Sequence, residues 1–358
     1  MGNELARQLS TLGHEVHLIT DGGSLSGYDR GVHVHTISQR DFWRSAIKTI
    51  LMLESEKLLD LVHIHNLVIH RSFSPFLGIL RRRSKLPVVA YCCQLPGLSF
   101  SNWVEVFRKD PWEALSNKIG MLAPPMTSEW TIRTVDKLIV SSSFIGRQLS
   151  AAKPKRKIDI IPPFLDDNKF KVQLEPPRLN SHPPFLLYLG SHKVLRGEDD
   201  FLRVLALMRS ECQDLEGVAI TPHPIPRRVT RLMRAKGLEG AVKFVHRGAD
   251  VDVPFLMKAA KLYVFTGLSP IGSIDPPLSV IESLILGTPV ASYDTGSIGE
   301  YLSSDYLATY GDYPTLAKKG SDILHQESRA RPRTELMQQF SSSYAVKQFI
   351  SSYEALVA

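Results

Sequence analysis

The stretch IDPPLSVIESLILGTPVASYDTGSIGEYL, residues 274–302, contains the pattern that decides the fold of this chain. Two prolines, Pro276 and Pro277, stand where a helix begins, a position at which a missing N–H group costs little. The β-branched run PVASYD at 289–294 follows that helix, and another such run, LYVFTG at 262–267, precedes it. A strand, a helix and a second strand in succession predict two parallel strands joined by a crossover helix.

The same alternation extends over the rest of the chain, with helical segments between short β-branched runs. These further runs are HEVHLIT (14–20), VHVHTI (32–37), LVHIHN (61–66), PVVAYCC (87–93), KLIVSS (137–142), IDIIP (158–162), PFLLYLG (184–190), GVAITP (217–222) and VKFVHR (242–247). Such alternation predicts an α/β fold with parallel sheets that helices cover on both faces. We therefore expect two Rossmann-like, doubly wound domains.

A proline-rich segment at 163–184 interrupts the alternation and predicts a linker between the two domains. We expect an N-terminal domain at 1–165, a second domain at 180–335 and a C-terminal helix at 336–358 that returns to the first domain. In SSYAVKQFISSYEALVA (342–358), apolar residues recur with helical spacing and predict one buried stripe, formed by Ala345, Phe349, Tyr353 and Leu356.

The composition excludes several classes of protein. The chain has 358 residues, 43% of them hydrophobic and 22% charged, which excludes disordered and fibrous proteins. No run approaches the roughly 18 apolar residues of a membrane-spanning helix. Three cysteines, two of them adjacent, argue against a disulfide framework and favour a reducing compartment. No signal peptide is visible, and we expect a cytoplasmic protein. The net charge of +7 allows an anionic partner without selecting one.

Residues 274–302 resemble the donor-binding signature of glycosyltransferase family 4, a retaining family with the two-domain GT-B fold. Further segments resemble the family in the same order: GNELARQLSTLGHEVHLIT (2–20), DLVHIHN (60–66), KLIVSSSFIGRQL (137–149), IIPPF (160–164) and YLGSHKVLRG (188–197). The resemblance covers essentially the whole chain, without the family's opening strand and glycine loop. It implies two Rossmann-like domains that face each other across a cleft, the second holding the donor and the first the acceptor.

The resemblance implies transfer of a sugar from a UDP- or GDP-sugar to a glycan, a lipid-linked acceptor or a small molecule. No metal and no other cofactor is expected, because GT-B enzymes neutralise the leaving pyrophosphate with cationic side chains and a helix N-terminus. The chain departs from the family pattern at several positions. A non-catalytic GT-B partner or regulatory subunit is therefore the alternative, and a GT-B epimerase is a more distant one.

In YLGSHKVLRG a strand ends at Gly190 and a helix begins near Gly197. Arg196 matches the cationic residue that the family carries before this glycine, and its guanidinium is expected to bind phosphate oxygens, with a surface arginine as the alternative. The family often has a further arginine where this chain has Ser191. Lys193 is a possible substitute for that charge.

The helix start after Pro277 is the second part of the expected donor site. Backbone N–H groups of Leu278 and Ser279 would face an anion, and the resemblance gives Glu282 the ribose hydroxyls. An ordinary first-turn glutamate is the alternative. The family's further glutamate is replaced by Ile274, and the neighbouring Asp275 either contacts the transferred sugar or caps the helix. Arg196 and Asp275 are the expected catalytic residues.

Other chemically suggestive residues have simpler explanations. His63 and His65 share one strand face, but no third metal ligand with recognisable spacing accompanies them. Cys92 and Cys93, where the family frequently has a histidine nearby, are expected to be small apolar core residues. The DVD sequence at 250–252 mimics a metal-binding motif, yet Asp252 there is an ordinary helix N-cap.

Basic runs do not indicate nucleic-acid binding. RRRSK (81–85) ends a helix and complements its dipole, and KPKRK (153–157) lies in a loop; neither has interleaved aromatic residues. Both could instead contact acidic lipid head groups, which would make the protein peripheral to the inner membrane surface. The aromatic-rich stretch at 98–115 is a candidate acceptor or membrane contact, with a packing segment as the equal alternative.

Only Met1, Gly2 and Asn3 precede the expected first amphipathic helix. A doubly wound domain normally opens with a strand and a glycine-rich turn. Either the domain lacks this strand or the sequence starts late. We expect a natural reading frame that extends roughly 15–30 residues upstream and encodes a strand and a Gly-Gly turn.

Overall fold

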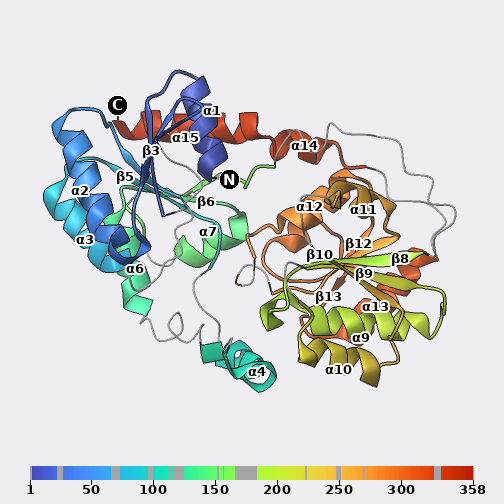
Figure 1. Ribbon diagram of the computed structural model, residues 1–358. Helices are drawn as coiled ribbons and strands as arrows, with labels where there is room; N and C mark the ends of the chain where they lie inside the picture. The colour runs from blue at the N-terminus through green and yellow to red at the C-terminus, as the bar shows by residue number, and fades with distance from the viewer. Residues whose placement is uncertain are drawn as a thin grey trace. The chain divides into compact units, whose positions relative to one another are not determined.

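The computed structural model describes residues 2–21, 27–65, 73–95, 100–112, 114–115, 125–150, 153–155, 157–165, 184–221, 224–246, 251–268, 271, 273–325 and 332–357 (Figure 1). The chain divides into two compact units. Unit 1 comprises Met1–Gly97, Lys118–Leu165 and Gln339–Ala358, and unit 2 comprises Leu98–Asn117 and Asp166–Gln338. Most of the proline-rich segment at 163–184 lies outside the described residues.

Unit 2 contains a six-stranded sheet in which every pairing is parallel. In chain order its strands are β8 (Phe185–Leu189), β9 (Glu216–Thr221), β10 (Val242–His246), β11 (Leu262–Phe265), β12 (Val290–Tyr293) and β13 (Leu307–Ala308). Their order across the sheet is β10-β9-β8-β11-β12-β13, which is the 3-2-1-4-5-6 order of a Rossmann fold. The strand order therefore reverses between β8 and β11, the point at which doubly wound sheets bind ligands.

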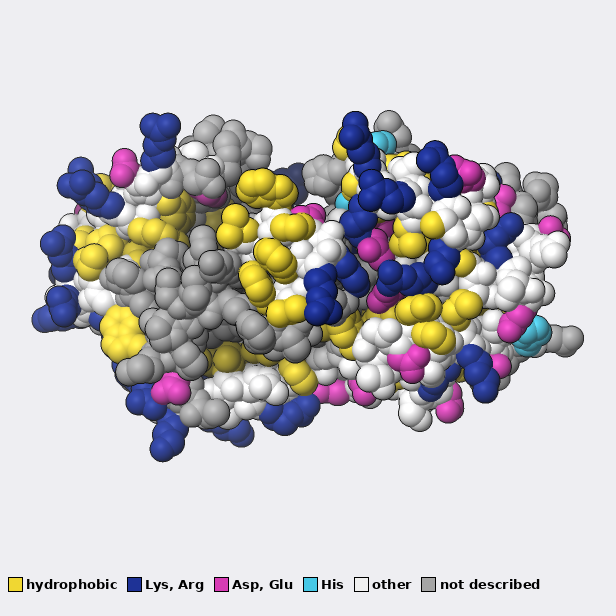
Figure 2. Space-filling view, turned by 90° about the horizontal axis from the view of Figure 1, so that it is seen from below, with side chains coloured by type: hydrophobic (Ala, Val, Ile, Leu, Met, Phe, Trp, Pro, Cys, Tyr) yellow, Lys and Arg dark blue, Asp and Glu magenta, His cyan; other side chains and the backbone are white. Residues whose placement is uncertain are grey.

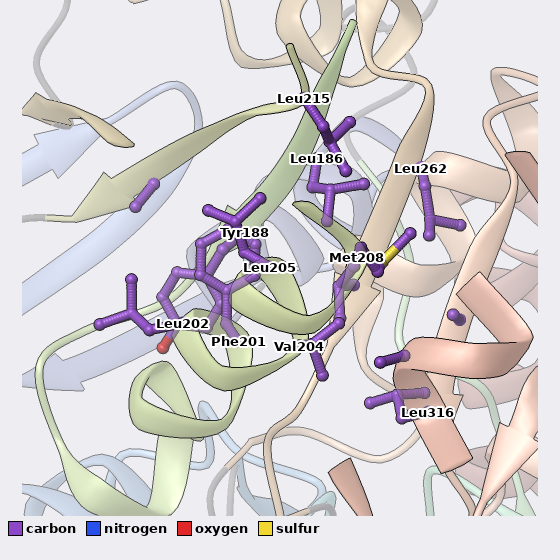
Figure 3. Packing of buried hydrophobic residues seen from close by; sticks show 14 of the residues in the cluster. Leu186, Tyr188, Phe201, Leu202, Val204, Leu205, Met208, Leu215, Leu262 and Leu316 are labelled. Carbon is purple, nitrogen blue, oxygen red and sulfur yellow. The ribbon is translucent and has the colours of Figure 1, made fainter. Parts of the chain in front are cut away.

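Helices follow the strands of unit 2. They are η2 (Val194–Arg196), α9 (Glu198–Arg209), α10 (Arg227–Ala235), α11 (Val253–Ala259), α12 (Leu278–Ile285), η3 (Ile298–Glu300), η4 (Ser304–Tyr306), α13 (Tyr313–Leu324) and α14 (Glu335–Gln339), the last ending in unit 1. Phe201, Leu205 and Met208 of α9 pack against the sheet, as Figure 3 shows. The side chain of Tyr188 stacks on Phe201 with ring centroids 5.1 Å apart. This packing fixes the end of β8, where the candidate site begins.

Unit 1 contains two separate sheets. In the first, β1 (Val16–Thr20) and β3 (Val32–Thr36) are parallel and β2 (Gly27–Asp29) is antiparallel to β3. The second is the parallel sheet β4 (Val62–Ile64), β5 (Val88–Cys92), β6 (Lys137–Val140) and β7 (Asp159–Ile160). The remaining helices described are α1 (Gly2–Thr11), η1 (Gln39–Asp41), α2 (Phe42–Ser55), α3 (Phe73–Arg83), α6 (Pro125–Thr134), α7 (Ser143–Ser150) and α15 (Ser342–Val357) in unit 1, and α4 (Phe100–Lys109) in unit 2.

β1 and β4 each end a sheet and each has one edge without a strand partner among the described residues. A cavity of about 490 Å³ lies beside both strands and is lined by residues of α1, β1, β4 and α15. We call this cavity the strand slot. His63 and His65 of β4 line it, and a buried ring nitrogen of each has no hydrogen-bond partner in the described part of the chain. The expected upstream reading frame stays a prediction.

The C-terminal helix α15 lies against unit 1. Ala345 and Phe349 are almost completely buried, and the Phe349 ring lies 5.4 Å from that of Tyr91 and 5.5 Å from that of His63. The Tyr353 hydroxyl and Nδ1 of His63 form a hydrogen bond. Phe349 and Tyr353 of the predicted stripe therefore contact residues of β4 and β5.

All eleven predicted strands are present, and the α/β fold class is confirmed. Two short strands, β2 and β13, were not predicted. The predicted first domain included residues 98–115, whereas Leu98–Asn117 groups with unit 2, because Val106 and Ala114 are buried with residues of that unit. Trp112 of the same segment is 80% exposed. The segment therefore has one side chain face that is packed and an aromatic side chain that is exposed.

The surface carries both signs of charge. On the face shown in Figure 2, Lys and Arg side chains are spread widely and acidic side chains lie among them. Arg81, Arg82 and Arg83 form the last turn of α3, as expected for residues that complement a helix dipole. None of the helices in the described residues has the length and hydropathy needed to cross a lipid bilayer.

Candidate functional site

The first part of the site is the loop between β8 and α9, at the carboxyl edge of the unit 2 sheet. The buried hydroxyl of Tyr188 donates to the backbone carbonyl of Arg196 at 3.1 Å and lies 3.3 Å from that of Ser191. A Cβ atom built on Gly190 would overlap this hydroxyl, so glycine is required there. The Tyr188 hydroxyl thus holds the backbone of this loop. The side chain of Lys193 is exposed, and that of Arg196 is half-buried.

Gly197 joins this loop to α9 and touches the adjoining strand end. Its φ of 75° is in the left-handed region, which glycine adopts readily. The hydroxyl of Thr266, directly after β11, donates to the Gly197 carbonyl at 2.7 Å. A second connection runs from the backbone N–H of Leu268 to the carbonyl of Leu195 at 2.9 Å. The segments after β8 and β11 are therefore tied together at the switch point of the sheet.

The start of α12 is the second part of the site. The hydroxyl of Tyr263 in β11 lies 2.8 Å from the Ser279 hydroxyl in the first turn of α12. Burial raises the pKa of Tyr263; the Ser279 hydrogen bond lowers it, the Glu282 carboxylate raises it and the Arg196 guanidinium lowers it. Arg196, Ser279 and Glu282, predicted from distant parts of the sequence, thus all act on one tyrosine hydroxyl. Sequence analysis did not single out Tyr263.

The two helix N-termini near the switch point differ in charge. α9 begins with Glu198, Asp199 and Asp200, which are buried. They are paired with His192 at 2.8 Å, with Arg228, and with the Tyr293 hydroxyl at 3.0 Å, respectively. Burial raises the pKa of Glu198, whereas the His192 hydrogen bond and the Arg228 charge lower it. The dipole of α9 is therefore already compensated by carboxylates of its own first turn.

α12 has no acidic residue in its first turn and no side-chain cap at Pro277. Its first N–H groups, which include those of Leu278 and Ser279, have no partner within the helix, since the intrahelical bonds begin one turn later. Leu278, Ser279 and Glu282 are all partly exposed. Of these two helix N-termini, that of α12 is therefore the one suited to bind an anion.

Asp275 has a different position from the one expected of a sugar-binding carboxylate. Its side chain has no exposed surface, and Oδ1 accepts a hydrogen bond from the backbone N–H of Ser297 at 3.0 Å. Because a fully buried carboxylate cannot contact a sugar directly, the structure favours a positioning role, in which Asp275 ties the loop before α12 to the loop after β12. The residue that caps α12 is Pro277.

Three hydroxyls near Asp275 were missed by the sequence analysis. The side-chain oxygens of Ser273, Thr295 and Ser297 are buried and have no hydrogen-bond partner in the described residues. Serine and threonine are too common in loops for their sequence positions to indicate this. Buried polar atoms without partners are rare, and these lie on the two loops that Asp275 connects.

The remaining candidate residues have roles in packing or helix capping. Cys92 and Cys93 are buried as small core residues. The carboxylate of Asp252 accepts from the Phe255 N–H at 2.9 Å and caps α11, as predicted, while Asp250 lies outside the described residues. His63 and His65 belong to the packed wall of the strand slot.

Comparison with known proteins shows the family and the fold of the chain. Residues 3–169 match the model of Glycosyltransferase Family 4, and residues 170–340 match that of Glycosyl transferases group 1. The glycosyltransferase YqgM of Bacillus subtilis is 26% identical over 335 residues, which cover 90% of this chain and 82% of YqgM. The N-acetyl-alpha-D-glucosaminyl L-malate synthase of Bacillus anthracis is 22% identical over 377 residues, covering 99% of this chain and 92% of the synthase.

Solved structures share the fold at low sequence identity. The sucrose-phosphate synthase of Thermosynechococcus elongatus has a TM-score of 0.74 at 16% identity, with 99% of this chain and 92% of the synthase covered. HepE of Anabaena, in complex with UDP and glucose, has a TM-score of 0.69 at 16% identity, with 98% and 94% covered. Since two family models in sequence cover residues 3–340 and the GT-B structures match, the chain belongs to glycosyltransferase family 4 and is a nucleotide-sugar-dependent glycosyltransferase of the GT-B type.

Proposed function

We propose that unit 2 binds a UDP-hexose through the loop after β8 and the start of α12, and that the hexose is transferred with retention of its anomeric configuration. The observation that carries this proposal is the surroundings of Tyr263 at the switch point of a doubly wound sheet: its hydroxyl lies 2.8 Å from that of Ser279, and the charges of Arg196 and Glu282 both affect its pKa. A cation, an uncompensated helix N-terminus and a carboxylate are the groups that a nucleoside diphosphate requires.

Each group has a role that follows from its chemistry. The first N–H groups of α12, at Leu278 and Ser279, would bind phosphate oxygens along the positive end of the helix dipole. The Arg196 guanidinium would bind further phosphate oxygens, and the exposed Lys193 would add a second positive charge. Glu282, one turn into α12, would accept hydrogen bonds from the two ribose hydroxyls. No metal ion is required in this arrangement.

The names of related proteins favour UDP over GDP and a hexose as the sugar. HepE was solved with UDP and glucose, and a structurally similar trehalose-phosphate synthase is UDP-forming. The Bacillus anthracis relative is named for an N-acetylglucosaminyl product. The acceptor is a hydroxyl of a glycan, a lipid-linked molecule or a small molecule. We place the reaction in the cytoplasm, with a peripheral contact to the membrane if the acceptor is lipid-linked.

Retention constrains the chemistry of transfer. The bond between the anomeric carbon and the β-phosphate oxygen breaks, and the acceptor oxygen bonds to the same face of the sugar. The acceptor proton passes to the departing phosphate oxygen, so that no enzyme nucleophile is needed. The site then acts by stabilising the charge that develops on the diphosphate, through Arg196 and the N-terminus of α12.

Calorimetric titration with UDP, GDP, UDP-glucose and UDP-N-acetylglucosamine tests the donor assignment. We expect saturable binding of UDP and of at least one UDP-hexose, with GDP weaker. Absence of binding by any nucleotide would refute the assignment. Slow release of UDP from the bound UDP-hexose, followed by chromatography, would separate an active transferase from a protein that binds its donor without turnover.

A further inference from the structure

A cluster of imidazole rings lies on the first sheet of unit 1, and it shares no residue with the proposed donor site in unit 2. β1 and β3 run parallel in register, with His17 opposite His33. The alternate side chains pack with α1 in a small core formed by Ala6, Val16, Leu18, Val32 and Val34. Because successive side chains of a strand point to opposite faces, His17, His33 and His35 share the other face.

Glu15, directly before β1, completes this cluster. One possible ligand atom each from Glu15, His17 and His33 lies within 4.8 Å of the other two. Nε2 of His17 is 3.1 Å from the Glu15 carboxylate, and the rings of His17 and His33 stack with centroids 4.7 Å apart. Strand register therefore holds three donor groups around one point.

The donor set selects a class of ion. Two imidazoles and one carboxylate form a set that binds zinc and related divalent transition metals, whereas Mg²⁺ and Ca²⁺ prefer all-oxygen sites. Tetrahedral zinc places its ligand atoms about 3.3 Å apart, so the three atoms must move closer together and the stacked rings of His17 and His33 must turn toward the ion. The side chain of His17 is only 6% exposed, while Glu15 and His33 are exposed.

His35 has the position of a supporting group. Its Nε2 lies 3.0 Å from Nδ1 of His17. If Nε2 of His17 binds a metal, Nδ1 carries the ring proton and donates it in a hydrogen bond to His35. Metal-binding histidines almost always donate this second N–H to a carboxylate, a carbonyl or water, and here the His35 ring nitrogen would take that place.

We propose that Glu15, His17 and His33 form a zinc-class metal site, with His35 as the residue that orients His17. The ion would have three protein ligands and a fourth, solvent position. Its role would be to join β1 to β3. The site is independent of the proposed donor site and of the chemistry of transfer, for which no metal is needed.

The test uses full-length protein without an affinity tag, stripped of metal with a chelator and titrated calorimetrically with ZnCl₂ alone. We expect one zinc ion per chain and a higher melting temperature in its presence. His33→Ala, which removes an exposed ligand from the surface, should weaken zinc binding by about 10-fold or more, and Glu15→Gln should weaken it as well. His35→Ala should weaken it less than His33→Ala.

A matched control is His246→Ala, which removes an exposed histidine at the end of a strand in unit 2 and should bind zinc like the native protein. Circular dichroism checks that each variant is folded. Binding of Co²⁺ should produce the intense visible absorption of a tetrahedral site, and His33→Ala should abolish it. The proposal is overturned if zinc does not bind stoichiometrically, or if His33→Ala and Glu15→Gln bind it as tightly as the native protein.

Discussion

The hydroxyl of Thr266 donates a 2.7 Å hydrogen bond to the backbone carbonyl of Gly197, and so joins the segment after β11 to the N-terminus of α9. The two residues approach so closely that a Cβ atom on Gly197 would overlap the backbone of Thr266. Gly197 also has a φ of 75°. One glycine therefore permits both the turn into α9 and the closure of the switch point.

We expect Gly197→Ala to destabilise the chain by about 3 kcal/mol, since it combines the cost of a left-handed alanine with a backbone overlap. Gly237→Ala is the control, because Gly237 has a φ of 64° but no neighbour within 4 Å of an added Cβ. It should cost only about 1 kcal/mol. Urea unfolding followed by circular dichroism measures both. Equal losses would mean that the contact with Thr266 contributes nothing.

Glu282→Ala should weaken UDP binding by about 1–3 kcal/mol, about 5- to 150-fold, because a ribose contact through charge-assisted hydrogen bonds is lost. Glu211→Ala, an exposed glutamate just after α9, should leave the affinity unchanged. Calorimetry with UDP and with UDP-hexose compares the two variants. If Glu282→Ala retained native affinity for UDP, the assigned ribose contact would be wrong. Binding of inorganic pyrophosphate tests the phosphate site at α12 separately.

Much of the fold could be predicted from the sequence, because most of its strands are short runs of β-branched and other hydrophobic residues. β13 consists only of Leu307 and Ala308, and so short a strand has no periodicity to detect. Arg196, Ser279 and Glu282 of the proposed donor site come from the family resemblance. Tyr263 was not predicted, because in the sequence a tyrosine within a buried strand looks like any other core residue.

The buried acids of α9 show why the rest of the site could not be predicted. Three consecutive acids at a helix start normally form an exposed first turn. Glu198 pairs with His192, six residues earlier, but Asp199 and Asp200 have partners in Arg228 and Tyr293, which lie 29 and 93 residues further along the chain. Pairing at such separations is a property of the folded sheet and has no local signal.

Stability should decrease with acidity through two histidines of unit 1. Burial lowers the pKa of His63 well below its usual value and that of His65 to about 4, so the folded chain holds both rings neutral. The unfolded chain binds protons below a pH of about 6.5. The contribution of these rings is therefore complete above pH 6.5 and is lost as the pH falls toward 4, by up to about 1.4 kcal/mol per pH unit for each ring.

Urea unfolding at a series of pH values measures this loss. His65→Gln should flatten the dependence between pH 6.5 and 4, whereas His246→Gln, at an exposed position, should leave it unchanged. An unaltered slope in His65→Gln would show that His65 titrates normally in the folded chain.

The three thiols should differ in reactivity. Burial raises the pKa of Cys92 and of Cys93 to about 12, whereas Cys212 is exposed. Because the thiolate is the reacting species, native protein at pH 8 should react with about one equivalent of Ellman's reagent and unfolded protein with about three. Cys212→Ser should leave no rapidly reacting thiol in the native state. Rapid reaction of a second thiol would contradict the burial of β5.

The strand slot makes a structural prediction of its own. Among the described residues, β1 and β4 each have one edge without a strand partner beside one cavity, and such edges favour the addition of a strand. An N-terminal extension of about five β-branched residues, followed by two glycines, should pair with both edges and raise the melting temperature by several degrees. Gly2 lies beside His65 at the strand slot. Two glycines between Gly2 and the added strand are therefore enough for that strand to reach the slot.

The same extension with alternate residues replaced by proline is the matched control, because proline cannot donate to a sheet. Hydrogen exchange provides the local measurement. Backbone amides of β1 and β4 should become protected with the β-branched extension and stay unprotected with the proline version, while amides of unit 2 should not change. If both extensions gave the same melting temperature and the same exchange, the cavity between β1 and β4 would not be a site for a strand.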